Sequence, residues 1–252
     1  MNNSKVKISI VCYTNTLPFR WALKKSEVLT KIDLQEDIPS ICAQKLKFNQ
    51  VDIALVPVAL LAELPTYSIV SDYCIGAFKK VDSVMLYSDV PLHEIETIVL
   101  DYQSLTSINL VKVLSKFFWN INPTFVNAFP GFENQSKGTK ASVVIGDRTF
   151  ELNGTYKYEY DLAEEWYKFT QLPFVFAVWA STKNVDENIV SEFNKALELG
   201  VNNIDTALNE MPASSIKKGY NVSNYLKNCI SYNLDDLKKQ AIYLFLEYMK
   251  KL

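Results

Sequence analysis

The stretch "TIVLDYQSLTSINLVKVLSKFF", residues 97–118, decides the fold because it passes from strand to helix within a few residues. The apolar run "TIVLD" is typical of a buried strand, and "INLVKVLSKFF" repeats its apolar residues at the spacing of an amphipathic helix. Between them stand three hydroxyl residues, Ser104, Thr106 and Ser107. A strand that leads directly into a helix is one unit of an α/β fold, so we expect further strands and helices in alternation.

The alternation continues on both sides of this stretch. Residues 6–13 read as a strand before a short helix over 17–25, a helix is expected over 36–49, and everything beyond Lys183 reads as helix. A proline-bearing connection at 88–95 predicts a crossover into a second lobe, from which the apolar run 174–181 returns. The sequence therefore predicts a two-lobed α/β protein with a ligand cleft between the lobes. Lobe 1 is expected to comprise residues 1–90 plus 178–252, and lobe 2 residues 91–177.

Composition excludes several classes of function. The 26 basic and 28 acidic residues give a net charge of −2 without a long basic run, so no nucleic-acid partner is expected. The chain has one histidine, His93, and its four cysteines form no CxxC pair, which argues against a catalytic triad, a metal site and a disulfide framework. No apolar window reaches the roughly 18 residues of a membrane span, and the N-terminal run is too short for a signal peptide. We expect a cytoplasmic protein with a small-molecule partner and no membrane partner; no motif encodes its oligomeric state.

Four loops that follow predicted strands are expected to meet in the cleft, and three of them are rich in short polar side chains. They are "TNT" (14–16), "VPVAL" (56–60), "DYQSLTS" (101–107) and "GDRT" (146–149). A helix N-terminus leaves backbone N–H groups unpaired, so Ser104, Thr106 and Ser107 with those amides are suited to hold a carboxylate or phosphate. The alternative is structural: Ser104 or Thr106 caps the helix, which stabilises it by about 1 kcal/mol, and the other hydroxyls face water.

Six segments in this order resemble the menaquinone biosynthesis family of the futalosine route, most of all its chorismate dehydratases. The match extends from about residue 8 to 181, with a weaker helical tail. The segments are "YTNTLPF", "VDIALVPVALL", "YCIGAFKKVDSVMLYS", "LDYQSLTSINLVKVL", "VVIGDRTF" and "YDLAEEWYKFTQLPFVFAVW". The resemblance implies a type II periplasmic-binding-protein-like fold, no cofactor, and loss of water from chorismate to give 3-[(1-carboxyvinyl)oxy]benzoate.

The resemblance also implies roles for individual residues. Asn15 and Ser83 are expected nearest the reacting atoms as catalytic residues, and no metal takes part. The remaining polar residues of these loops are expected to contact the substrate, with the hydroxyls of the 104–107 loop on a carboxylate. This substrate-binding set comprises Thr14, Thr16, Ser104, Thr106, Ser107 and Asp147.

Two positions depart from the family pattern. Leu105 stands where the family more usually has arginine, and Ala77 where it often has serine. If that arginine faces the ligand, its loss weakens chorismate binding roughly ten- to a hundred-fold; if it faces outward, the change is nearly neutral. Two other functions stay open: a small-anion binding protein or sensor without turnover, and 1,4-dihydroxy-6-naphthoate synthase, which is expected to use a histidine base.

Overall fold

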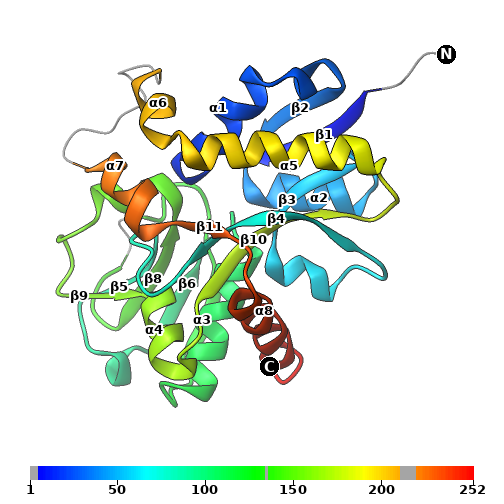
Figure 1. The fold of residues 1–252 in the computed structure, drawn as a ribbon. Helices are drawn as coiled ribbons and strands as arrows, with labels where there is room; N and C mark the ends of the chain where they lie inside the picture. Colours follow the sequence, from blue (N-terminus) through cyan, green and yellow to red (C-terminus); the bar gives the residue numbers. More distant parts are fainter. Residues whose placement is uncertain (1–4, 134–135, 211–219) are drawn as a thin grey trace.

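The computed structural model of the protein describes residues 5–133, 136–210 and 220–252 (Figure 1). Within these residues the chain forms a six-stranded and a five-stranded sheet, each covered by helices, and the two sheets belong to two lobes. The two-lobed α/β architecture predicted from the sequence is confirmed. No helix in the described ranges has the length and apolar composition that crossing a membrane requires.

The first sheet joins strands from the beginning, the middle and the end of the chain, in the order β11-β4-β10-β3-β1-β2. β1 pairs in parallel with β2 and β3, whereas β10 runs antiparallel to β3 and β4. Every residue of β3 is buried, as expected for a central strand with both faces covered. The bounds are β1 (Val6–Val11), β2 (Ile32–Asp37), β3 (Ile53–Pro57), β4 (Ser68–Ala77), β10 (Phe174–Ser181) and β11 (Ser231–Asn233).

Helices cover both faces of this sheet, and α1 packs along α5 in Figure 1. Prolines in the first turns of α1 and α2 suit those positions because the first helical N–H groups need no intrahelical partner. The helices are α1 (Leu17–Lys25), α2 (Pro39–Lys47), α5 (Glu187–Asn202), α6 (Ile204–Asn209), α7 (Val222–Asn224) and α8 (Asp236–Met249). Shorter turns of helix are η1 (Thr14–Thr16), η2 (Glu27–Thr30), η3 (Val58–Ala62) and the π-helix η7 (Tyr225–Cys229).

The second sheet has the order β7-β6-β8-β5-β9. β6 pairs in parallel with β7 and β8, and β5 runs antiparallel to β8 and β9. Its strands are β5 (Val84–Ser88), β6 (Thr97–Leu100), β7 (Thr124–Asn127), β8 (Lys140–Ile145) and β9 (Tyr158–Asp161). Its helices are α3 (Leu105–Phe117) and α4 (Leu162–Thr170), with the short turns η4 (Leu92–Glu94) and η5 (Gly146–Glu151).

The chain changes sheets earlier than the sequence predicted. Because β4 belongs to the first sheet and β5 to the second, the outward crossover lies between Ala77 and Val84 and not at 88–95. The return lies between β9 and β10. A five-residue apolar strand such as β5 fits either sheet, and its pairing partners decide which. We therefore propose lobe bounds that follow the sheets, with residues 84–170 forming lobe 2, in place of 91–177.

Two segments that were predicted to be helical contain strand residues in the structure. Residues 36 and 37 end β2, so the helix expected from Glu36 begins only at Pro39. Beyond Lys183 the chain is not wholly helical, because β11 adds an edge strand antiparallel to β4. Both strands lie at edges of the first sheet, where only one neighbouring strand constrains their pattern.

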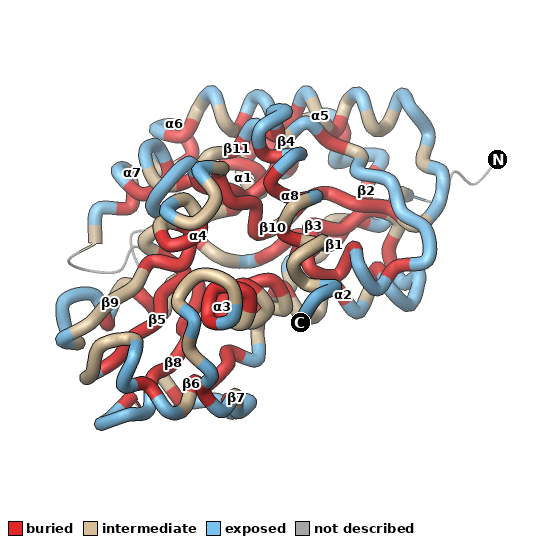
Figure 2. The backbone as a smooth tube through the Cα atoms, turned by 90° about the horizontal axis from the view of Figure 1, so that it is seen from below, coloured by how far each residue is buried: buried red, intermediate tan, exposed pale blue. Residues whose placement is uncertain are grey.

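One buried apolar cluster extends through both lobes, and Figure 2 shows buried segments, coloured red, in each of them. Trp166 on α4 is fully buried and packs edge-on against Phe174 of β10 and Phe245 of α8. β10 and α8 belong to the first lobe, so this aromatic contact joins the lobes on the side where α8 packs on α3 and β10. The loops described next therefore rest on a shared apolar core.

Candidate functional site

A pocket lies where strand-end loops from the two lobes meet. The space between its walls is about 510 Å³ when space open to solvent is included, and the cavity itself has a volume of about 50 Å³. Among the described residues that line it, Tyr13 is the one with an ordinary titratable group, and none has a charged side chain. The lining residues are Val11, Tyr13, Asn15, Pro39, Leu55, Pro57, Ile75, Val81, Ser83, Val84, Ser104, Ser107, Ile145, Gly146, Phe176 and Ala177.

Asn15 reaches the pocket from η1, the turn that follows β1. Its Oδ1 atom is buried, and no hydrogen-bond partner for it exists among the described residues. A buried amide oxygen without a partner costs about 1–3 kcal/mol, and such an atom in a pocket is positioned to bind a ligand. The backbone carbonyl of Asn15, in contrast, accepts a hydrogen bond from the Tyr232 hydroxyl at 3.1 Å.

The two threonines of η1 make contacts within the protein and do not line the pocket. The Thr14 hydroxyl and backbone N–H donate to the Asp147 carboxylate at 2.9 and 3.1 Å, which joins the first lobe to the second. The Thr16 hydroxyl is fully buried and donates to the Tyr13 carbonyl at 2.9 Å. Each hydroxyl has one proton to donate, and the protein uses both. Substrate contact by Thr14, Thr16 or Asp147 stays a prediction.

In the loop before α3, the capping and the pocket-lining interpretations hold together. Ser104 is the N-cap of α3 and accepts the Ser107 backbone N–H at 3.2 Å. The two hydroxyl oxygens lie 3.0 Å apart, both residues are buried, and both line the pocket. The pocket therefore adjoins a helix N-terminus, which attracts negative charge.

Thr106 turns away from the pocket and connects the lobes. Its buried hydroxyl donates to the Phe176 carbonyl at 3.0 Å and accepts the Ala59 backbone N–H at 3.2 Å. Both partners belong to the first lobe, whereas Thr106 lies on α3 of the second. A substrate contact by Thr106 also stays a prediction.

Leu105, the residue that departs from the family pattern, lines a separate groove beside the pocket. The groove runs between α2, η3 and α3, and Ser104 is the residue it shares with the pocket. Lys47 and Glu63 also line the groove and form an ion pair with 2.6 Å between Nζ and Oε2. Leu105 therefore shares this groove with an ion pair and does not line the pocket.

Ser83 lies at the outward crossover, where backbone and side-chain contacts hold it. The preceding residue, Asp82, adopts a positive φ of 61°, which turns the chain sharply into β5. The Asp161 carboxylate accepts the backbone N–H groups of Val81 and Asp82 at 2.8 and 2.7 Å. Burial raises the pKa of Asp161 to about 6. The Ser83 hydroxyl oxygen accepts a hydrogen bond from the Tyr225 hydroxyl at 2.7 Å.

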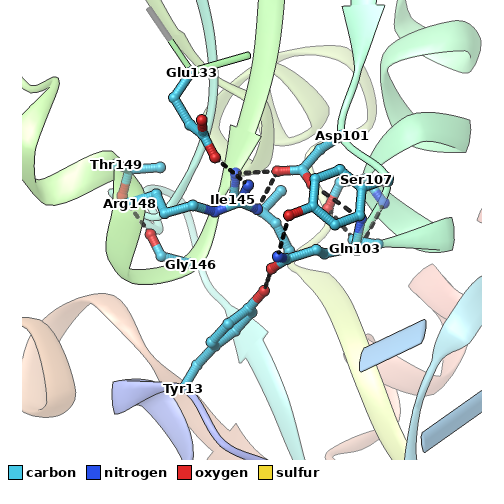
Figure 3. Close-up of polar contacts among 11 residues, drawn as sticks. Tyr13, Asp101, Gln103, Ser107, Glu133, Ile145, Gly146, Arg148 and Thr149 are labelled. Atoms are coloured by element: carbon cyan, nitrogen blue, oxygen red, sulfur yellow. Dashed lines mark hydrogen bonds and ion pairs between the residues drawn. The ribbon is translucent and has the colours of Figure 1, made fainter. Parts of the chain in front are cut away.

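A polar network on the second-lobe side of the pocket joins Tyr13 to the loops around β6 and β8 (Figure 3). The Tyr13 hydroxyl donates to the side-chain oxygen of Gln103 across the lobes. Behind it, the Arg148 guanidinium binds Asp101 at 2.5 Å and Glu133 at 2.8 Å. Burial raises the pKa of Asp101 even though the Arg148 charge opposes this shift. Because Arg148 is paired twice, it fixes the loop and does not offer a free cation to the pocket.

The Tyr13 ring lies so close to Gly146 that the position has no room for a side chain. A Cβ atom at Gly146 would lie 2.8 Å from the Tyr13 ring, and the residue has φ of +68°, which side chains other than glycine rarely adopt. The loops selected from the sequence contain Gln103 and Arg148, but no role was predicted for these two residues or for Tyr13. The signal available was the position of Tyr13 and Gln103 beside residues already selected, in "YTNT" and "YQSLTS".

His93 lies in η4 with a side chain that is 77% exposed, and it does not line the pocket. The histidine base expected of 1,4-dihydroxy-6-naphthoate synthase therefore has no counterpart among the lining residues. Across residues 5–133, 136–210 and 220–252, no cluster of three or more His, Cys, Asp or Glu side chains is arranged to hold a metal ion.

Comparison with known proteins gives a family match, a curated relative and similar solved structures. The family model described as menaquinone biosynthesis matches residues 6–251. A curated chorismate dehydratase from Thermus thermophilus is 24% identical over 192 residues, which cover 67% of this chain and 66% of that relative. The chain thus spans just under two thirds of the length of the curated relative it matches.

Solved structures show the fold. A protein from Archaeoglobus fulgidus superposes with a TM-score of 0.76 at 12% identity, covering 98% of this chain and 97% of that one. A Candida albicans protein described as having the generic periplasmic binding protein fold gives a TM-score of 0.61 at 12% identity, with coverages of 99% and 91%. The periplasmic-binding-protein-like fold predicted from the sequence is confirmed.

Proposed function

The chain belongs to the menaquinone biosynthesis family, and from this premise we propose that it is a chorismate dehydratase acting in the futalosine route. The reaction removes water from chorismate and yields 3-[(1-carboxyvinyl)oxy]benzoate. Support comes from the family match over nearly the whole chain and from the name of the Thermus thermophilus relative. The observation that carries the proposal is that Asn15 and Ser83, which come from different loops, line one pocket in which the Asn15 Oδ1 atom has no partner among the described residues.

The chemistry needs few groups from the protein. A base removes the proton on ring carbon C3, the electron pair of that C–H bond becomes a ring double bond, and the C4–O bond breaks. The C4 hydroxyl leaves and takes up a proton, so one water is released and the ring becomes aromatic. The protein must orient the substrate and stabilise the departing oxygen.

Asn15 and Ser83 have the functional groups that the leaving hydroxyl requires. The Ser83 oxygen already accepts from Tyr225, so its own proton is available to donate to the C4 oxygen. The buried Oδ1 of Asn15 accepts the hydrogen of the same hydroxyl and holds its orientation. Both contacts are made without an ionised side chain.

Among the described residues that line the pocket there is no ordinary base. Tyr13 is the one titratable group in this set, and burial raises its pKa, so it stays protonated at neutral pH. We therefore assign the proton transfer to the substrate's own enolpyruvyl carboxylate, which lies beside C3 because the ether oxygen is bonded to that carbon. The other carboxylate fits the N-terminus of α3, where Ser104 and Ser107 supply hydroxyls and the helix dipole attracts negative charge.

Purified protein incubated with chorismate tests the proposal. Product is followed by mass, and Asn15→Ala is expected to lower kcat at least a hundred-fold while the melting temperature stays within a few degrees. The matched control is Asn109→Ala, because Asn109 is a half-buried residue of α3 that does not line the pocket and donates a hydrogen bond to the Leu105 carbonyl. Chorismate that stabilises the protein without being consumed would sink the dehydratase proposal and favour the binding protein or sensor.

A further inference from the structure

The segment 225–232 supports both proposed catalytic residues, although it follows the part of the chain that carries the family motifs. It comprises the π-helix η7 and the start of β11. Tyr225 and Tyr232 are buried, with 1% and 5% of their surface exposed. Their hydroxyls donate to the Ser83 Oγ atom at 2.7 Å and to the Asn15 carbonyl oxygen at 3.1 Å. One segment therefore contacts both residues.

Tyr225 determines what the Ser83 hydroxyl can do. A serine hydroxyl has one proton and two lone pairs, and the Tyr225 proton occupies one of the lone pairs. Burial raises the Tyr225 pKa well above its ordinary value, so the phenol keeps its proton and remains the donor. The Ser83 hydroxyl can therefore donate its own proton. No described residue accepts that proton, and because Ser83 lines the pocket, a bound ligand can accept it.

The Tyr225 ring packs against a residue of the second lobe. It packs edge-on against Phe150 at 5.1 Å between ring centroids, and Phe150 belongs to η5 of the second lobe. Tyr225 opens a π-helix, a rare form of helix that occurs often at functional sites. From the first residue of this helix, the Tyr225 hydroxyl reaches Ser83 at the crossover.

Tyr232 acts on the backbone of the opposite loop. Its hydroxyl holds the Asn15 carbonyl, and its ring packs edge-on against Phe19 of α1 at 5.2 Å. With the carbonyl fixed, the η1 turn presents the Asn15 side chain to the pocket. The strand that carries Tyr232 pairs with β4 through Ser231 and Gly76, one residue before β4 ends.

We propose that Tyr225 and Tyr232 are positioning residues for the dehydration, Tyr225 through the Ser83 hydroxyl and Tyr232 through the Asn15 backbone. The inference rests on the proposed function for its substrate, but the geometry it describes exists without substrate. Removing either hydroxyl should leave substrate binding nearly intact and reduce the rate of the chemical step. The kcat for chorismate is expected to fall about tenfold with KM changed less than threefold.

Tyr225→Phe and Tyr232→Phe test this, with Tyr248→Phe as the matched control. Tyr248 is a half-buried tyrosine whose ring packs on Trp166 and Phe169, away from the pocket lining. The control should keep its kcat. In a Ser83→Ala background, Tyr225→Phe should have no further effect on kcat, because its partner is gone. An equal loss in both backgrounds, or a loss of thermal stability alone, overturns the proposal.

A second readout separates this proposal from the proposed function. In high-resolution crystal structures without ligand, Ser83 should keep one rotamer in the wild-type protein and populate others in Tyr225→Phe. If the wild-type protein does not convert chorismate, the proposed function fails and the Ser83 rotamer still decides the positioning role. A Ser83 side chain that keeps its rotamer in Tyr225→Phe refutes that role whatever the kinetics show.

Discussion

The loops 14–16 and 104–107 look alike in sequence but use their polar side chains differently. In the first, both threonine hydroxyls bond to protein groups and the Asn15 amide oxygen alone is left without a described partner. In the second, Thr106 bonds to the first lobe while Ser104 and Ser107 bond to each other and still line the pocket. A cluster of polar residues thus combines residues that build the loop with residues that face the ligand.

The difference lies in what each loop offers to a substrate. The first loop presents the Asn15 Oδ1 atom, an acceptor without a partner in the described part of the chain, which suits a group that carries a proton, such as a hydroxyl. The second presents hydroxyls at a helix N-terminus, which suit an anion. Single substitutions can test whether each residue of a loop is needed for stability or for contact with the substrate.

Thr106→Val should have the largest effect on stability. Its hydroxyl satisfies two buried backbone groups, the Phe176 carbonyl and the Ala59 N–H, and valine satisfies neither. At about 1–3 kcal/mol for each buried unsatisfied group, we expect the free energy of unfolding to fall by roughly 2–4 kcal/mol. Urea unfolding measures it. A loss below about 0.5 kcal/mol would show that Thr106 is not a structural member of its loop.

Ser107→Ala should affect substrate binding more than stability. The Ser107 hydroxyl bonds the Ser104 hydroxyl and lines the pocket, whereas its backbone N–H, which the cap uses, is kept in alanine. We expect KM for chorismate to rise about tenfold, the equivalent of one charge-assisted hydrogen bond, with stability changed by less than about 1 kcal/mol. Steady-state kinetics and urea unfolding on the same preparation give both numbers. If instead stability falls and KM is unchanged, Ser107 belongs with Thr106.

The crossover that carries Ser83 is a third loop, in which the Asp161 carboxylate accepts hydrogen bonds from the backbone N–H groups of Val81 and Asp82. Asp161 has an ordinary pKa of 3.8 that burial raises to about 6 in the folded protein. Between these values the folded protein binds a proton that the unfolded chain does not, so this group adds stability as the pH falls and removes it as the pH rises through about 6. From pH 7 to 5 the contribution is about 1 kcal/mol.

Asp161→Asn should abolish that contribution, since the amide does not titrate. The difference between the two proteins in unfolding free energy, measured by urea at pH 5 and pH 7, isolates the group from all others. In the wild-type protein, protonation also weakens the bonds to the Val81 and Asp82 N–H groups, so kcat should fall below about pH 6. A pH dependence that is identical in both proteins would contradict this assignment.

The sequence predicted the features of the fold that depend on interactions between residues close together in the chain. The start of α3 after Ser104 and the β-α alternation follow from capping residues and periodicity, which act over a few residues. The two tyrosine contacts could not be predicted, because Tyr225 and Tyr232 lie 142 and 217 residues from Ser83 and Asn15. Periodicity reports that such residues are buried and does not report which partner they meet. The early crossover was missed for the same reason.

Leu105→Arg should have the smallest effect, and it tests which face of the second loop meets the ligand. Leu105 lines the groove beside the pocket, where Lys47 and Glu63 already pair, so a guanidinium added there gains little and faces a neighbour of each sign. We expect kcat/KM for chorismate to change less than threefold. The matched comparison is Ile108→Arg, because Ile108 lines the same groove one turn further along α3. If Leu105→Arg alone raises affinity ten- to a hundred-fold, the side chain at 105 reaches the substrate when the lobes open, and the pocket defined by Asn15, Ser83 and Ser107 must extend into the groove.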